Sequence, residues 1–159
     1  MKKVLYKLDC LCNDLKMEYM VTGTAALAIT GFPTYIKPQD IDILVTNLTD
    51  HQKEELLKQE FLSGLDTKEY KDTQTCFGFY ICGVKINVIA STYTRDYLLE
   101  TSNPIVLRTD KERFCVNVQK TRHALEEKMK LGRAKDKDFL LDVISNLMDI
   151  NNAKVVKCG

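Results

Sequence analysis

Apolar and polar positions along the first third of the chain predict a helix, a strand and a second helix. Apolar residues recur at spacings of three and four over residues 2–16, which predicts an amphipathic helix. The strand-like run Glu18-Tyr19-Met20-Val21 predicts a short strand. Residues 25–29 then form a compact apolar segment, which predicts a buried helix with Thr24 as its N-cap.

The middle of the chain has the pattern of strands around a charged helix. Residues 40–45 alternate acidic and apolar side chains and then become wholly apolar, as in a central strand entering a core. Residues 50–60 are strongly charged and predict a surface helix. Residues 75–82 and 84–90 alternate with a period of two around Gly83, which predicts a hairpin.

The last third of the chain is expected to finish the sheet and then to become helical. The expected elements are a loop at 91–104 with one helical turn, strands at 105–107 and 114–118, a helix at 119–131, a break at Gly132, a helix at 135–150 and a polar tail. This order predicts one α/β (α+β) domain over residues 1–159 with a small mixed sheet. Its core is expected at about 17–118 and its helical part at about 119–150.

Composition narrows the class of protein. Hydrophobic residues are 45% of the chain and charged residues 28%, which excludes a disordered or fibrous chain. Lys and Arg total 23 against 22 for Asp and Glu, so the net charge of +1 is too balanced for a protein that coats DNA. The apolar stretches are too short to span a membrane, so no membrane partner is expected. Six cysteines without a CxxC pair predict reduced, mostly buried thiols in a cytosolic protein.

The most informative motif is Asp40-Ile41-Asp42. On a strand, residues two apart share a face, so the two carboxylates project together with their Cα atoms about 6–7 Å apart. A divalent cation with oxygen ligands, Mg²⁺ or Mn²⁺, would relieve their repulsion. Two solvated acids at a strand edge are the alternative. The upstream strand ends in Thr22-Gly23-Thr24 at a helix start, where backbone N–H groups can bind phosphate.

These residues carry a family resemblance. The run VTGTAALAITGFPTYIKPQDIDILV, residues 21–45, resembles the core signature of the nucleotidyltransferase (DNA polymerase β-like) superfamily. The resemblance is closest to the short bacterial branch that includes minimal nucleotidyltransferases and abortive-infection or toxin–antitoxin proteins. A second patch is similar to that branch, with Lys128 on one helix and residues 133–139 opening the next.

The resemblance implies a role for each matching residue. Gly23 and Thr24 would bind the triphosphate of a nucleoside triphosphate, with ATP as the first candidate. Asp40 and Asp42 would hold Mg²⁺ bridging those phosphates, and Lys128 would reach the nucleotide as a positive charge. The stretch from 120 to 137 holds seven Lys or Arg residues, and a solvated helix face remains its alternative interpretation. The resemblance also implies that Lys37 is a basic residue near the metal-binding strand. Arg133, Lys135 and Asp138 would structure the base of their helix or line the rim of the nucleotide site.

The chain departs from the family pattern at three places. Thr24 stands where the family has Gly or Ser, and residues 36–39 replace the usual Arg-x-Thr before the acidic motif. Asn87 stands where the third catalytic carboxylate should fall, and a neutral amide cannot act as a base.

Three hypotheses for function follow. The first is a Mg²⁺-dependent transfer of a nucleoside monophosphate to a hydroxyl on a protein, an RNA or a small molecule. The second, favoured by Asn87, is a catalytically degenerate nucleotide-binding or protein-interaction module. The third is a structural protein that uses the domain only for assembly.

Overall fold

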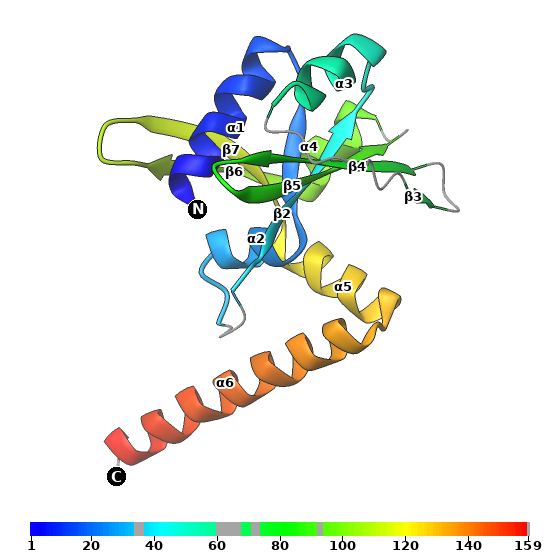
Figure 1. Cartoon of the computed structure of the whole chain (residues 1–159). Helices are drawn as coiled ribbons and strands as arrows, with labels where there is room; N and C mark the ends of the chain where they lie inside the picture. Colours follow the sequence, from blue (N-terminus) through cyan, green and yellow to red (C-terminus); the bar gives the residue numbers. More distant parts are fainter. Residues whose placement is uncertain (34–36, 60–67, 71–73, 92–93, 159) are drawn as a thin grey trace.

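The computed structural model describes residues 1–33, 37–59, 68–70, 74–91 and 94–158. Within these ranges the chain forms a seven-stranded sheet flanked by helices (Figure 1). The strands are β1 (Tyr19–Thr22), β2 (Asp40–Thr46), β3 (Lys68–Tyr70), β4 (Gln74–Ile81), β5 (Val84–Ser91), β6 (Ser102–Arg108) and β7 (Arg113–Gln119). The helices are α1 (Lys2–Asp14), α2 (Gly23–Ile29), α3 (Asp50–Leu57), α4 (Arg95–Thr101), α5 (Thr121–Leu131) and α6 (Ala134–Cys158).

The sheet is mixed, which confirms the predicted fold class. Its strand order is β3-β4-β5-β2-β1-β7-β6. The β2–β5 and β1–β7 pairs are parallel, whereas the other neighbouring strands are antiparallel. The central strands β1 and β2 come from residues that lie close together in the sequence. Strand β5, the second strand of the predicted hairpin, pairs with β2 on its other side.

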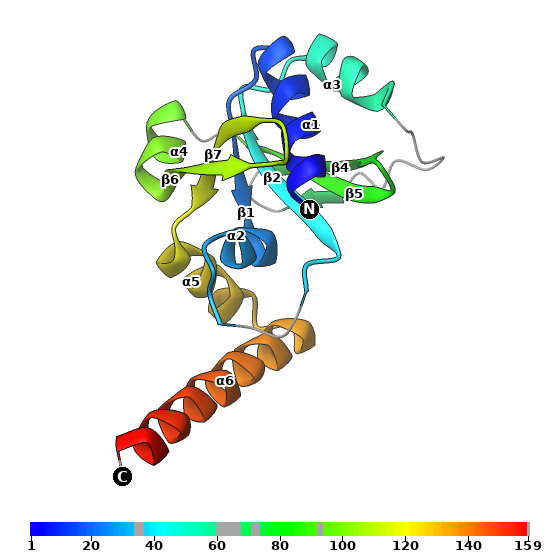
Figure 2. The same ribbon diagram turned by 90° about the vertical axis from the view of Figure 1, so that its left-hand side faces the viewer.

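The two faces of the central sheet differ, as strand β2 shows: one face lies in the main core and the other carries the acidic motif. Ile43 and Val45 of β2 pack in a fully buried cluster with Leu8 of α1, on the side that α1 and α3 cover (Figures 1 and 2). Leu44 points to the opposite face, where it packs against Leu98 of α4. Because side chains alternate along a strand, the two acids at the start of β2 lie on that second face.

The C-terminal helices pack beneath the sheet against α2. Leu27 of α2, Ala124 of α5, and Phe139 and Val143 of α6 form a small buried cluster. Gly132 ends α5 in a left-handed conformation with φ of 55°, as its position in the sequence predicts. Both views show α6 extending away from the sheet. The helix runs to Cys158, so the prediction that it ends at 150 was wrong.

Two further local predictions were wrong. Thr24 is not an N-cap, because α2 begins at Gly23 and its N-cap is Thr22, which still pairs with Asp42 in the sheet. The segment expected to be a loop with one helical turn at 91–104 contains the longer helix α4, of seven residues, and its end already belongs to β6. Helix α4 begins where the Thr94 side chain accepts a hydrogen bond from the Tyr97 N–H.

The cysteines are only partly as expected. Among the described positions, Cys12 is buried, and its free thiol has a pKa that burial raises to about 12. Three other free thiols are exposed, so the prediction of mostly buried cysteines was wrong for them: Cys10, Cys82 and Cys115. Along the described ranges, no helix combines the length and the apolar character needed to cross a bilayer.

Candidate functional site

The two acids of the sequence motif open β2 at the sheet edge nearest α2. Asp42 pairs in register with Thr22, the last residue of β1. Asp40 is exposed and Asp42 is half-buried, so both carboxylates remain accessible from solvent. The sheet therefore brings the acidic motif and the start of α2 together, as the sequence predicts.

Asn87 lies directly beside this acidic pair. It is the register partner of Asp42 on the parallel strand β5. Its Nδ2 donates a hydrogen bond of 2.8 Å to Asp42 Oδ1, and it lies 3.5 Å from Asp40 Oδ2. The amide thus joins two carboxylates that would otherwise repel each other, and it occupies the position that the resemblance assigns to a third acid.

The start of α2 touches the acidic pair at Gly23. Gly23 has φ of +64°, and a Cβ on it would lie 3.5 Å from Asp42 Oδ2. Its backbone N–H donates to Oε1 of the buried Gln119 at 3.0 Å. Glycine is therefore suited to this turn by its backbone conformation, whereas a Cβ would make only an ordinary contact with the carboxylate.

A buried cation lies beside the start of α2, on the side of α5. The Lys128 ammonium donates a 2.9 Å hydrogen bond to Thr24 Oγ1 and lies 4.5 Å from the centre of the Phe139 ring. Burial lowers the pKa of Lys128, while the carboxylates of Asp136 and Asp42 raise it. Lys128 thus links α5 to α2 and places positive charge within electrostatic reach of Asp42.

Asp136, at the start of α6, anchors this lysine. Its carboxylate is 1% exposed and lies 3.8 Å from the Lys128 ammonium. Arg133 donates two hydrogen bonds to it, from Nε at 2.6 Å and from Nη2 at 3.1 Å. Chiefly through the hydrogen bond from Arg133, the pKa of Asp136 is held below its ordinary value.

The other site residues predicted near Lys128 and the acidic pair are exposed to solvent. Lys135 is exposed on the first turn of α6, near enough to Lys128 to lower its pKa. Lys37 is exposed in the segment before β2, and Asp138 is exposed on α6. Asp136 and Phe139 belong to the predicted patch at 133–139 but the sequence assigns them no role, and it does not single out Gln119, because the local pattern around each resembles solvated or ordinary core positions.

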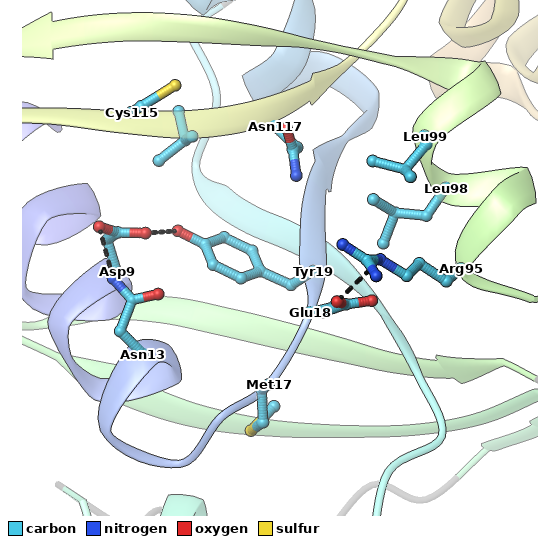
Figure 3. Close-up of a pocket in the computed structure, with 11 residues that line it drawn as sticks. Asp9, Asn13, Met17, Glu18, Tyr19, Arg95, Leu98, Leu99, Cys115 and Asn117 are labelled. Atoms are coloured by element: carbon cyan, nitrogen blue, oxygen red, sulfur yellow. Dashed lines mark hydrogen bonds and ion pairs between the residues drawn. The ribbon is translucent and has the colours of Figure 1, made fainter.

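A separate pocket of about 190 Å³ lies at the opposite end of β1, between α1, α4 and β7 (Figure 3). Tyr19 donates a 2.8 Å hydrogen bond to Asp9 there, and Arg95 pairs with Glu18 at 3.0 Å. Tyr19 is the register partner of Val45, so β1 separates this pocket from the acidic pair. None of the site residues predicted from the sequence lines it.

Comparison with known proteins supports the architecture. A "putative nucleotidyltransferase" from Thermotoga maritima superposes with a TM-score of 0.55 at 16% identity, covering 90% of this chain and 93% of that one. The chain has a nucleotidyltransferase fold. An antigenic nucleotidyltransferase-like protein from Paracoccidioides brasiliensis matches with a TM-score of 0.46 at 18% identity, over 91% of this chain and 73% of that one. No protein-family model and no curated protein matches the chain.

The donor set of this nucleotidyltransferase-fold chain fits a magnesium ion. In the described part of the chain, no three His, Cys, Asp or Glu side chains converge on a common point. Asp40 and Asp42 do converge, because one amide nitrogen lies between their oxygens. Mg²⁺ is commonly bound by one or two carboxylates together with the phosphates of a substrate. Two acids beside a buried lysine suit that mode of binding.

Proposed function

We propose that this protein is a Mg²⁺-dependent nucleotidyltransferase that transfers a nucleoside monophosphate from a nucleoside triphosphate to a hydroxyl acceptor. The observation that carries the proposal is the convergence of Asp40 and Asp42 beside the first turn of α2. ATP is the first candidate for the nucleotide, and a protein, an RNA or a small molecule is the acceptor.

The charges around the acidic pair support a triphosphate as the ligand. Asp40 and Asp42 would hold Mg²⁺, which neutralises charge that develops on the phosphates during transfer. Lys128 lies on the other side of Thr24 and provides a buried positive charge next to the Thr24 hydroxyl. Arg133 and Lys135 lie near Lys128 and would add positive charge at the rim.

The start of α2 contributes less to phosphate binding than the resemblance implies. The Gly23 N–H already donates to Gln119, so this donor would have to exchange partners to reach a phosphate. The exposed Lys37 lies three residues before Asp40 in the sequence and would add positive charge there. We therefore assign the phosphates chiefly to the cation, Thr24 and Lys128.

The proposed reaction is a single displacement at the α-phosphorus. The acceptor oxygen forms a bond to that phosphorus, the bond to the oxygen bridging to the β-phosphorus breaks, and diphosphate leaves. The hydroxyl proton is released to solvent, because Asn87 stands beside the acids and a neutral amide cannot take it. The chain's own residues position the phosphates and offset their charge, which supplies most of the catalysis in phosphoryl transfer.

Label transfer tests this proposal. The protein is incubated with Mg²⁺, a cell extract and ATP labelled at the α-phosphorus, and with the other nucleoside triphosphates in parallel. We expect α-label, but no γ-label, to appear on an acceptor. Replacing both Asp40→Asn and Asp42→Asn should reduce transfer to background. Equal labelling by the wild type and this double variant would refute the assignment of the site.

A nucleotide-binding module is the second candidate, and Asn87 is the observation that favours it. An enzyme of this kind that lacks a carboxylate at position 87 retains groups to bind Mg²⁺ and phosphate but lacks a base. The same label experiment separates the two candidates. Mg²⁺-dependent nucleotide binding without transfer to any acceptor would identify the module.

A further inference from the structure

Asn87 lies between the two carboxylates, at the place where a further ligand of the cation would be needed. Its side chain lies on the same face as Asp40 and Asp42, and its Nδ2 lies 2.8 Å from one carboxylate and 3.5 Å from the other. A cation held by the two acids would lie close to this nitrogen, since both seek the same oxygens. In the metal-free protein, the partial positive charge of the amide N–H group therefore lies where the cation would bind.

The side chain of Asn87 has a glycine as its neighbour on strand β4. On its other side, Asn87 is the register partner of Gly78 in β4. A Cβ at Gly78 would lie 3.5 Å from Asn87 Oδ1 and 3.0 Å from Cε of Lys85. Because Gly78 has no side chain, Asn87 Oδ1 meets no side-chain atom from that position, and Cε of Lys85 lies beside the same place. A half-turn of the amide would exchange its nitrogen and oxygen without a clash at position 78.

The neighbours of the acidic pair on β5 limit the charge of the site. Lys85 is the register partner of Asp40, and Asn87 is that of Asp42. Both are half-buried on the face that carries the acids, so β5 contributes one cation and one amide to it. Among the residues that the structure describes, the site thus has two carboxylates and no third, which provides charge for one divalent cation.

We propose that Asn87 is an uncharged third ligand in a site for one divalent cation, its amide turning to present Oδ1 when the ion binds. The proposal rests on the proposed function, in which Asp40 and Asp42 hold the metal. Amide oxygens are accepted ligands of hard cations, and the number of charged ligands sets the affinity of such sites. Asparagine therefore gives this chain a weaker site than three carboxylates would.

Manganese binding by the full chain tests the proposal without any measurement of activity. Free Mn²⁺ is followed by electron paramagnetic resonance in the wild type, Asn87→Asp and Asn87→Leu. We expect one Mn²⁺ per wild-type chain, affinity about tenfold or more tighter in Asn87→Asp, and weaker affinity in Asn87→Leu, which keeps the size but has no oxygen. Asn103→Asp makes the same charge change at an exposed position of β6 and should bind like the wild type.

Thermal unfolding in EDTA gives a second readout. Asn87→Asp places a third carboxylate against two others and removes their hydrogen-bond donor, so its Tm should fall below that of Asn103→Asp. Adding Mn²⁺ should raise the Tm of Asn87→Asp more than that of the wild type.

The outcomes separate this inference from the proposed function. If Asp42→Asn abolishes Mn²⁺ binding but Asn87→Asp and Asn87→Leu bind like the wild type, Asn87 is not a ligand and the acidic site stands. Two ions per wild-type chain, or binding by Asn87→Asp but not by the wild type, would also overturn the inference. No binding by any of the chains would overturn the metal site of the proposed function, and this inference with it.

Discussion

Replacing Asp136 by asparagine removes one charge at the turn between α5 and α6 while keeping the shape of the side chain. The carboxylate is 1% exposed, accepts two hydrogen bonds from Arg133 and lies 3.8 Å from the Lys128 ammonium. Without it, the side chain of Lys128, which is 10% exposed, keeps only Thr24 and the Phe139 ring as described partners. The substitution therefore removes the carboxylate charge that acts more strongly on this buried cation and leaves only the weaker effect of Asp42.

The expected loss of stability follows from this burial. Removing one partner of a buried ion pair costs about 3–5 kcal/mol. Arg133 is 48% exposed and stays hydrated without Asp136, so we expect the lower part of that range, about 3 kcal/mol. For a chain of this length, each kcal/mol lowers the Tm by roughly 2–4 °C, so Asp136→Asn should lower it by about 6–12 °C.

Calorimetric and urea unfolding at neutral pH measure this loss. Asp138→Asn is the matched control, because it neutralises an exposed acid on the same helix and should stay within about 0.5 kcal/mol of the wild type. A free energy of unfolding for Asp136→Asn as close to the wild type as that of the control would refute the role given to the buried carboxylate.

The dependence of this difference on pH has a definite sign. The pKa of Asp136 is lower in the folded protein than in the unfolded chain, chiefly because of the hydrogen bond from Arg133. Its contribution is therefore complete above the unfolded pKa of about 4 and is lost as the pH falls through the folded value. The stability gap between wild type and Asp136→Asn should be constant from pH 5 to 7 and should shrink on acidification below about pH 4.

Three smaller predictions concern other parts of the molecule. Gly23→Ala should lower the free energy of unfolding by about 1–2 kcal/mol in chemical denaturation, because the φ of Gly23 is +64°, and it should weaken Mn²⁺ binding beside Asp42. The control Gly31→Ala, at a φ of +74° in open space, should lower the free energy of unfolding by as much but leave Mn²⁺ binding unchanged. Tyr19→Phe removes the 2.8 Å hydrogen bond to Asp9 and should cost about 1–3 kcal/mol in the same measurement. Cys12 should resist alkylation at pH 8 until the protein unfolds, because it is buried and its pKa is about 12. Peptide mapping should find rapid alkylation at the exposed thiols Cys10, Cys82 and Cys115.

The elements that position the acids are readable in the sequence because their signals are local. The alternation over residues 40–45, the hairpin around Gly83 and the break at Gly132 each follow from side-chain period or backbone freedom within a few residues. The placement of Asn87 beside Asp42 depends on the parallel register of β2 and β5, for which the resemblance was the only guide.

The roles of Asp136 and Gln119 could not be predicted from the sequence, because they depend on contacts between residues that are distant in the chain. Asp136 lies in the run Lys135-Asp136-Lys137-Asp138, in which no local pattern distinguishes the buried acid from the solvated one. Only the packing of α6 on α5 brings Asp136 to Lys128 and leaves Asp138 exposed. Likewise, Gln119 looks like the end of a strand, and the parallel β1–β7 pair brings it to the Gly23 N–H. Tertiary contacts decided these roles, and no local propensity encodes them.

A calorimetric titration of ATP in the presence and absence of Mg²⁺ tests the central claim most directly. The wild type should bind one ATP only when Mg²⁺ is present, and the double variant Asp40→Asn with Asp42→Asn should bind none. A control that neutralises two exposed acids elsewhere, Asp14→Asn with Asp110→Asn, should bind like the wild type. Unchanged Mg²⁺-dependent binding in the Asp40 and Asp42 double variant would contradict the account.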